Sequence, residues 1–179
     1  MKGIVFTVFL ELVEDQFGIA MVEQIIAECD LKSNGVDTGA DIYSYKEMVS
    51  MVNKLSELKN MPVKELLKIF GKCFFTTLSK DYSQFMKQPV MSMFFKTIDS
   101  YIHPEVLKLY PEAVTPSFKA KMKSDNIMVL KYDYTRRMAD FAVGLIQGAA
   151  MFYKEKIIGQ KQEEFDAGQT LILNIKRES

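Results

Sequence analysis

The chain has 179 residues, of which 48% are hydrophobic, and this length and composition suit one globular domain with a sizeable core. Lys and Arg together number 23, as do Asp and Glu, so the net charge of zero gives no electrostatic reason to expect nucleic acid or an anionic membrane as partner. Glu11, Glu14 and Asp15 come too early for a secretory or membrane-spanning segment. We therefore expect a cytoplasmic protein, and its two cysteines, which lack a CxxC spacing, are expected to be reduced thiols.

The first part of the chain has the hydrophobic spacing of helices. Apolar side chains recur at helical intervals over three segments, which are residues 4–13 closed by Gly18, residues 19–29 and residues 44–58. Asn34-Gly35 marks a turn in the polar loop 30–41 between the second and third segments. The pattern predicts a helical N-terminal part.

Two prolines then mark the beginnings of helices. Pro62 stands where its missing N–H costs nothing, and an apolar stripe follows over residues 63–78. Pro89 begins a long helix whose apolar side runs over residues 90–101. The single histidine of the chain, His103, lies at the far end of this predicted helix.

The pattern changes to that of strands in the later part of the chain. Apolar and basic side chains alternate over residues 118–123, and a turn separates this strand from a second one over residues 127–134. A helix over about 137–156 precedes two further segments, 157–165 and 170–175, which we expect to pair. Strands clustered after a helical half indicate an α+β fold with an antiparallel sheet.

Gly144 and Gly148 lie four residues apart in the predicted helix 137–156, and therefore on one of its faces. Without side chains, they allow another part of the structure to approach closely. Ordinary helix packing explains the pair as well as any functional role does.

The sequence lacks the common catalytic and nucleotide-binding motifs. It has no Gly-rich phosphate loop and no Gly-x-Ser-x-Gly elbow, and neither cysteine lies in a recognisable nucleophile signature. Any catalytic triad with a histidine would have to use His103, because the sequence has no other histidine. A site made of carboxylates alone stays open, since a sequence does not show their spatial pairing. We expect a protein that is not an enzyme.

His103 allows two interpretations. A lone histidine beside an apolar stripe is most often a packed residue of the core or its boundary. It can also be the axial ligand of a haem iron, which needs only one protein ligand where zinc needs several. Pro104 disfavours helical geometry at His103 and removes a helical N–H, so we expect the helix to bend or restart there.

A second candidate group stands in the stretch YDYTRR. If the strand continues, Tyr132, Tyr134 and Arg136 share one face, because strand side chains alternate. Two phenols and a guanidinium on one face can bind a carboxylate, with Arg donating two parallel hydrogen bonds. The alternative is a strand end whose polar tips are simply solvated.

These features together resemble the haem nitric oxide/oxygen binding (H-NOX) family, which is related to the haem sensor domain of soluble guanylate cyclase. The resemblance runs essentially end to end. It includes the opening MKGIV, the pair Phe70-Gly71, and the stretches HPEVLKLYP and GLIQGAA. Its most specific element is the family's Tyr-x-Ser-x-Arg motif, read here as Tyr132, Tyr134 and Arg136, with a lone histidine some thirty residues upstream.

The resemblance implies a haem b cofactor and assigns residues to it. His103 matches the proximal histidine that ligates the iron, and Tyr132 and Arg136 match residues that hold the haem propionates. Pro116 matches a proline that presses on the porphyrin. Further positions around the haem and the distal gas pocket are matched by Val5, Phe9, Leu78 and Leu145. The implied architecture is one domain over residues 1–179, with a distal helical lobe over about 1–60 and a proximal α/β lobe over about 61–179.

The sequence departs from the family pattern at two positions. Tyr134 replaces the serine of the motif, and its larger phenol places the oxygen further out, where Arg137 could compensate. Phe141 stands where oxygen-binding members have a distal tyrosine, whose hydroxyl stabilises bound oxygen. Neither Phe141 nor its expected neighbours Val5, Phe9, Leu78 and Leu145 offers such a donor. The distal pocket therefore favours nitric oxide over oxygen.

The predicted function is a haem-based sensor that binds nitric oxide, and also carbon monoxide, at ferrous haem. The resemblance implies that release of His103 carries the signal to a separate protein, either a histidine kinase or a cyclic-di-GMP enzyme. Alternatives are an oxygen or carbon monoxide sensor of the same fold, and a haem-free ligand-binding scaffold. A haem peroxidase is disfavoured because no second histidine is present for distal acid–base work.

Overall fold

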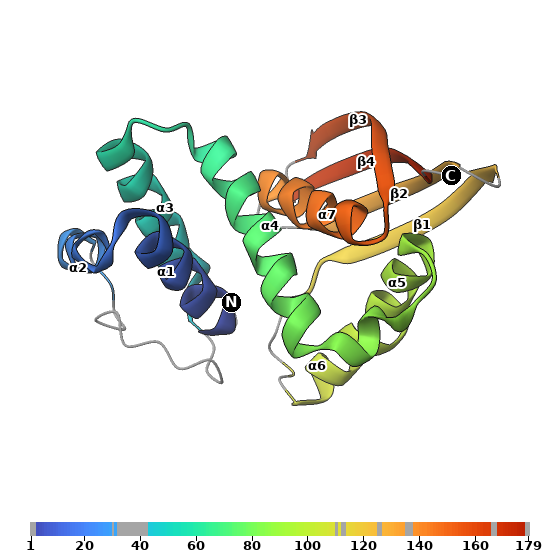
Figure 1. Ribbon diagram of the computed structural model, residues 1–179, viewed down its shortest axis with the longest axis horizontal. Coiled ribbons are helices and arrows are strands. Elements are labelled where there is room, and N and C mark those ends of the chain that lie inside the picture. The colour runs from blue at the N-terminus through green and yellow to red at the C-terminus, as the bar shows by residue number, and fades with distance from the viewer. Residues whose placement is uncertain are drawn as a thin grey trace.

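The computed structural model describes residues 3–29, 31, 43–109, 111, 114–124, 127–134, 138–165 and 168–177. Helices come first, followed by a hairpin, a helix and a second hairpin, as the sequence predicts (Figure 1). The first four helices are α1 (Gly3–Phe17), α2 (Ile19–Glu28), α3 (Tyr45–Lys59) and α4 (Val63–Asp81). No helix in the described ranges is long and apolar enough to cross a membrane. The predicted turn at Asn34-Gly35 lies outside the described residues.

Local residue chemistry sets the ends of these helices. Gly18 has a φ of 84°, which glycine adopts at little cost, and it separates α1 from α2. The Ser44 side chain accepts a hydrogen bond from the backbone N–H of Lys46 (3.3 Å) and so caps α3, and Asn60 ends that helix in the left-handed conformation. Pro62 directly precedes α4, in agreement with the sequence.

A helical segment leads from α4 towards the sheet. Its parts are η1 (Ser83–Lys87), α5 (Met91–Thr97), η2 (Ile98–Ile102) and α6 (His103–Leu109). The last three follow one another without a gap, so the long helix predicted after Pro89 is present. It contains one π-helical turn, η2, and it continues through His103 rather than ending there. The periodicity of the sequence did not predict the π turn.

The sheet is four-stranded and antiparallel, with the order β1-β2-β4-β3. The elements of this part are β1 (Ser117–Ser124), β2 (Ile127–Tyr134), α7 (Ala139–Phe152), β3 (Glu155–Phe165) and β4 (Gly168–Arg177). β3 pairs with β4 as predicted, with Ile157 opposite Ile175. The α+β fold class is confirmed.

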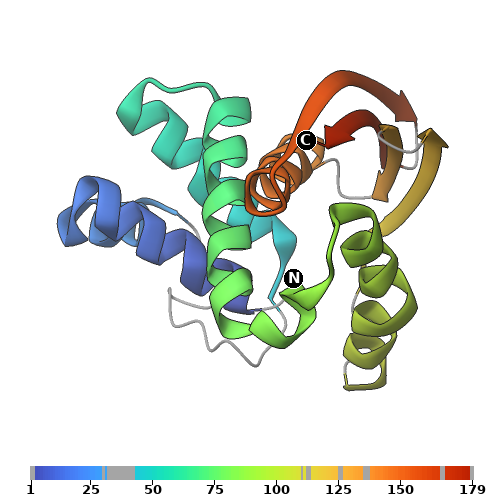
Figure 2. The ribbon, with the colours of Figure 1, turned by 45° about the vertical axis from the view of Figure 1, so that its right-hand side comes forward.

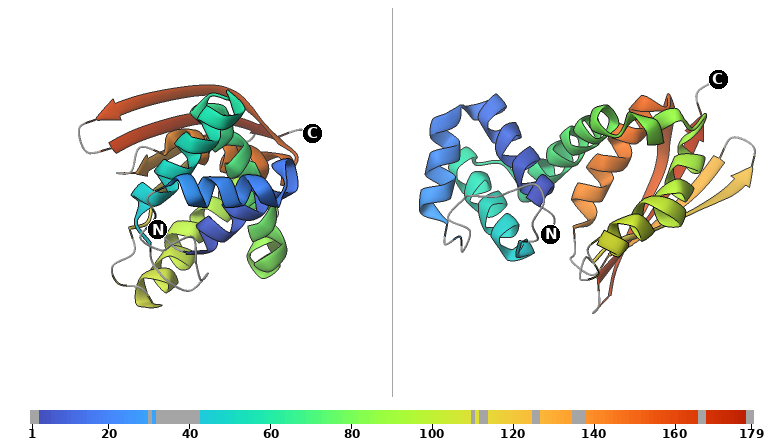
Figure 3. Two further views of the ribbon diagram at one scale, coloured as in Figure 1. Left: turned by 90° about the vertical axis from the view of Figure 1, so that its left-hand side faces the viewer. Right: turned by 90° about the horizontal axis from the view of Figure 1, so that it is seen from below.

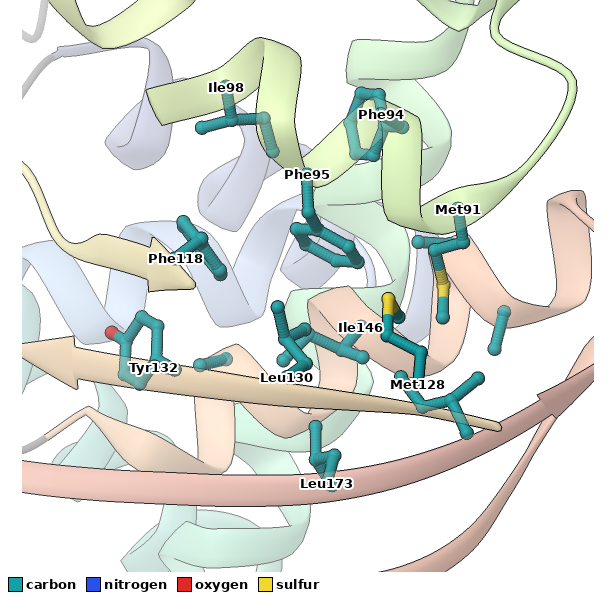
Figure 4. Close-up of a cluster of buried hydrophobic side chains, with 14 of the residues drawn as sticks. Met91, Phe94, Phe95, Ile98, Phe118, Met128, Leu130, Tyr132, Ile146 and Leu173 are labelled. Carbon is teal, nitrogen blue, oxygen red and sulfur yellow. The ribbon is translucent and has the colours of Figure 1, made fainter. Parts of the chain in front are cut away.

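The two faces of the sheet differ in character. Lys119, Lys121 and Lys123 on β1 are exposed, whereas Phe118 is buried and Ala120 is half-buried. The alternation ends at Met122, which is 45% exposed. Figure 4 shows Phe95 pointing from α5 towards Phe118 and Leu130 on the inner face. The buried residues of that inner face are Phe118, Met128, Leu130, Tyr132, Leu173 and Ile175. One face of the sheet therefore forms a core with α5 and α7.

Helices α4 and α7 cross at glycines. A Cβ on Gly71 would lie 2.6 Å from the backbone nitrogen of Leu145, and one on Gly144 would overlap the backbone carbonyl of Lys68. A Cβ on Gly148 would lie 2.9 Å from the Cβ of Phe75. The close approach expected at Gly144 and Gly148 is thus made by α4, which runs between α1–α3 and α7 in Figure 2.

The buried hydrophobic side chains form two clusters. The N-terminal core joins α1, α2, α3 and α4, and it includes Phe6, Phe9, Val13, Met51, Leu55, Phe70 and Phe74. The C-terminal core joins α4, α5, α7 and the sheet, and it includes Phe75, Phe95, Phe118, Leu130, Ile146 and Leu173. In the right-hand view of Figure 3, α1–α3 lie on one side of α4, and the sheet with α5 and α6 lies on the other. Helix α4 therefore contributes to both cores.

Candidate functional site

His103 is the first residue of α6 and follows the π turn directly. Its backbone is right-handed helical (φ −63°, ψ −42°), so the expected departure from helical geometry before Pro104 is wrong, whereas the predicted restart is present, since α6 begins at His103 after a π turn. The reason lies in η2, where the His103 N–H donates to the carbonyl of Ile98, five residues back. In an ordinary α-helix the ring of Pro104 would clash with the carbonyl of Ser100, and a wider π turn relieves that clash.

The imidazole of His103 is largely shielded from solvent. Its side chain is 17% exposed, and its Nδ1 lies 3.4 Å from Oδ1 of Asp99, one helical turn earlier. Its ring centroid lies 6.1 Å from that of Phe118. Burial lowers the pKa of His103, and the carboxylate of Asp99 opposes that shift. With Nδ1 turned towards a carboxylate, Nε2 is the nitrogen that remains for a metal.

Asp99 is the residue near His103 that the sequence analysis missed. Its Oδ2 accepts a hydrogen bond from the backbone N–H of Phe118 (3.0 Å), while its Oδ1 faces His103. The four-residue spacing between Asp99 and His103 was the available signal, since such pairs meet on a helix surface. The bond to Phe118 spans 19 positions and has no local signature.

Tyr132 lies close to this group on the neighbouring strand. It pairs with Phe118 in the sheet register, and the two ring centroids lie 5.2 Å apart. Tyr132 is 2% exposed, and Pro116 is half-buried just before β1. The structure therefore brings His103, Phe118 and Tyr132 together in a row.

The rest of the predicted anion clamp stays a prediction. Tyr134 is the last residue of β2. The side chain of Tyr134 lies outside the described residues, as do Arg136 and Arg137.

The five residues predicted for the distal pocket pack on one cluster. Val5 and Phe9 come from α1, Leu78 from α4, and Phe141 and Leu145 from α7. Phe9 is buried within the N-terminal core, and the other four are partly buried against it, with Leu145 also touching the C-terminal core. All five are hydrocarbon side chains without a hydrogen-bond donor.

Aromatic rings form the wall on which Phe141 lies. Its ring centroid lies 5.0 Å from that of Phe70 and 5.6 Å from that of Phe74. The ring of Phe70 in turn lies 5.2 Å from that of Phe9. Phe141 thus packs against two rings of α4, one of which also contacts Phe9 of α1, and the wall that these rings form is apolar.

The chemistry of these residues fits a haem. One shielded imidazole offers a nitrogen to iron, and large apolar side chains suit a flat macrocycle. Within the described ranges, no group of three or more His, Cys, Asp and Glu side chains is placed to hold a metal ion.

Comparison with known proteins also points to a haem-binding protein. The sequence model of the haem-NO-binding family matches residues 2–160. The chain belongs to this family. Proteins of this H-NOX family are haem-based gas sensors, and its domains act as sensor modules.

Solved H-NOX structures extend the similarity to the whole fold. The Fe(II) unliganded H-NOX protein from K. algicida is 31% identical, with a TM-score of 0.87, and the match covers 100% of this chain and 98% of that one. The S. oneidensis H-NOX protein in its Fe(II)NO state is 27% identical, with a TM-score of 0.85 and coverages of 99% and 100%. A mutant form of the T. tengcongensis H-NOX protein, at 23% identity, shares the fold with a TM-score of 0.89 and coverages of 100% and 98%.

Proposed function

We propose that this protein is a sensor that binds nitric oxide at ferrous haem b and discriminates against oxygen. The observation that carries the proposal is the shielded imidazole of His103, whose Nδ1 faces Asp99 and whose Nε2 remains for iron. Membership of the H-NOX family supports the cofactor. Haem, when bound, supplies the iron to which a diatomic gas attaches.

Several residues of the chain would hold the cofactor. His103 would bind the iron, and Tyr132, Tyr134 and Arg136 would orient the propionates by donating hydrogen bonds. Pro116 would press on one face of the porphyrin, and Val5, Phe9 and Leu78 would make further contacts with the haem. In this proposal residues 1–60 form the distal lobe and residues 61–179 the proximal lobe.

The choice of gas follows from the aromatic wall. Phe141 lies between Phe70 and Phe74 and has no hydroxyl to donate to a polar bound ligand. A missing hydrogen bond to a partly charged ligand costs roughly 1.5–3 kcal/mol, or about tenfold to a hundredfold in affinity. Oxygen depends on that bond more than nitric oxide or carbon monoxide does, because bound oxygen carries more charge.

Signal transmission is proposed to start at His103. His103 would hold the iron, and its release when a gas binds would change the balance between two arrangements of the lobes. A ligand shifts such a balance only if it binds one arrangement better than the other. We propose that this protein is cytoplasmic and that a separate effector protein, either a histidine kinase or a cyclic-di-GMP enzyme, receives the signal.

An absorption spectrum of the ferrous protein tests this proposal. Nitric oxide should convert the spectrum to that of a five-coordinate complex, and air should give no stable oxygen complex. His103→Gly should lose the iron ligand, and free imidazole added to that variant should restore the spectrum. A stable oxygen complex would favour the oxygen-sensor alternative, and a colourless protein that takes up no added haem would favour the scaffold alternative.

A further inference from the structure

Asp99 uses both of its carboxylate oxygens in the turn that precedes His103. Oδ1 lies 3.4 Å from Nδ1 of His103, and Oδ2 accepts a hydrogen bond of 3.0 Å from the backbone N–H of Phe118. The two contacts point to different elements, since His103 begins α6 and Phe118 belongs to β1. One carboxylate therefore connects the candidate iron ligand to the sheet.

The local backbone gives this carboxylate a fixed position. Asp99 lies in the π turn η2, whose wider winding ends where the His103 N–H reaches back to Ile98. The partner on the sheet is rigid as well, because Phe118 is buried and its ring stacks on that of Phe95 at 5.2 Å. A hydrogen bond to the backbone N–H of Phe118, a buried residue of another element, orients the carboxylate independently of its own helix.

A carboxylate that accepts the Nδ1–H of a histidine makes Nε2 a stronger donor to a metal and fixes the orientation of the ring. We propose that Asp99 is a positioning residue for His103, which strengthens the bond to iron through Nδ1 and couples that bond to β1 through Phe118. This inference rests on the proposed haem site. Because a stronger bond between iron and His103 slows the release of His103, Asp99 opposes the switch.

Two substitutions separate the two contacts of Asp99. Asp99→Asn keeps an oxygen that can accept from the Phe118 N–H, but it removes the negative charge beside His103. Asp99→Ala removes both contacts. Ser100→Ala is the matched control, because Ser100 lies in the same π turn, is exposed, and donates to the carbonyl of Lys96 rather than facing His103.

The first readout is the iron–histidine stretching vibration of the ferrous protein, measured by resonance Raman spectroscopy. Both Asp99 variants should lower its frequency, and Ser100→Ala should leave it unchanged. Stopped-flow mixing with nitric oxide should show release of His103 about tenfold faster in Asp99→Asn, since losing such a partner typically weakens a metal site by 10–100-fold.

The second readout needs no cofactor. In the apoprotein, amide hydrogen exchange at Phe118 should be faster in Asp99→Ala than in the wild type, and unchanged in Asp99→Asn and Ser100→Ala. Should Asp99→Ala fail to fold, Asp99→Asn still carries the first readout.

The outcomes distinguish this inference from the proposed function. If all variants bind haem through His103, and Asp99→Asn matches the wild type in both vibration and release rate, Asp99 has no positioning role. If Phe118 exchanges equally in the wild type and Asp99→Ala, the coupling to β1 is absent. If the wild type binds no haem through His103, the proposed function fails and the inference fails with it.

Discussion

Phe141 is held between two rings of α4, at centroid distances of 5.0 Å from Phe70 and 5.6 Å from Phe74. Phe141→Tyr adds one hydroxyl to this wall and changes little else. If the hydroxyl reaches a bound gas, oxygen affinity should rise by about tenfold to a hundredfold, which is the value of a hydrogen bond to a partly charged group. Oxygen titration of the ferrous protein measures this change.

Phe152→Tyr is the matched control for that experiment. Phe152 is the last residue of the same helix, is 48% exposed, and contacts Phe75 and Tyr153 rather than the distal residues. Its substitution should leave oxygen affinity unchanged. Equal affinities in Phe141→Tyr and the wild type would mean that position 141 does not face the gas.

Tyr153 gives a prediction about pH. Its hydroxyl donates to the carbonyl of Met86 (3.2 Å), and burial, together with the charge of Glu155, raises its pKa to about 12. An unfolded tyrosine has a pKa of about 10, so the unfolded state loses the proton first as pH rises. The contribution of Tyr153 to the free energy of unfolding is therefore fully present below about pH 10 and is lost as pH rises towards 12.

Tyr153→Phe should lower the free energy of unfolding by about 1 kcal/mol at neutral pH, because it removes one hydrogen bond to a buried carbonyl. It should also lose less stability than the wild type between pH 10 and 12. Urea unfolding at several pH values measures both effects. A variant whose alkaline loss equals that of the wild type would show that Tyr153 does not govern this range.

At the scale of elements, the crossing of α4 and α7 depends on Gly144. A Cβ there would overlap the backbone carbonyl of Lys68, which cannot move aside as a side chain can. Gly144→Ala should therefore push the two helices apart and destabilise the protein by about 1–3 kcal/mol, despite the better helix propensity of alanine. Urea unfolding of the apoprotein measures the loss.

Gly159→Ala is the comparison variant for this prediction. Its Cβ would lie 3.1 Å from the Nδ2 atom at the end of the Asn174 side chain, which can rotate away. Its free energy of unfolding should stay close to that of the wild type. Comparable losses for the two substitutions would contradict the special role of the helix crossing.

The elements that the sequence predicted are those governed by local pattern. The strand over 118–123 and the proline before α4 depend on residues close in the chain, and both predictions are confirmed, although the alternation of burial ends at Met122. The contact of Asp99 with Phe118 joins residues 19 apart, and it exists only because the π turn packs on β1. The sequence also could not predict which segment packs against Gly144, because a glycine indicates a close approach without identifying the neighbouring segment.

The same limit applies to the site. The sequence indicated His103 because it is the only histidine, and it indicated Phe141 through resemblance to relatives. The structure adds that Phe141 lies among the rings of Phe70 and Phe74 and that Asp99 faces the imidazole. Both contacts depend on tertiary structure, because the first is set by how α4 crosses α7 and the second by how η2 packs on the sheet.

At the scale of the whole molecule, the two candidate groups belong to different cores. The distal residues pack on the N-terminal core, whereas Phe118 and Tyr132, beside His103, belong to the C-terminal core. Leu145 touches both cores, and α4 contributes to each. A cofactor bound by His103 and by the distal residues would therefore add a connection between the two cores that the apoprotein makes mainly through α4 and α7.

Haem binding should accordingly stabilise both cores together against unfolding. At a free concentration of about a thousand times its dissociation constant, a ligand of the folded state adds roughly 4 kcal/mol, which raises the Tm of a domain of this size by roughly 8–16 °C. Metal-free protoporphyrin has the same flat surface but no iron for His103, so it should raise the Tm less, as scanning calorimetry would show. In His103→Gly the two porphyrins should act alike, because the only difference between them is the iron that His103 binds. Equal stabilisation of the wild type by both would mean that His103 does not ligate iron, whatever else the pocket holds.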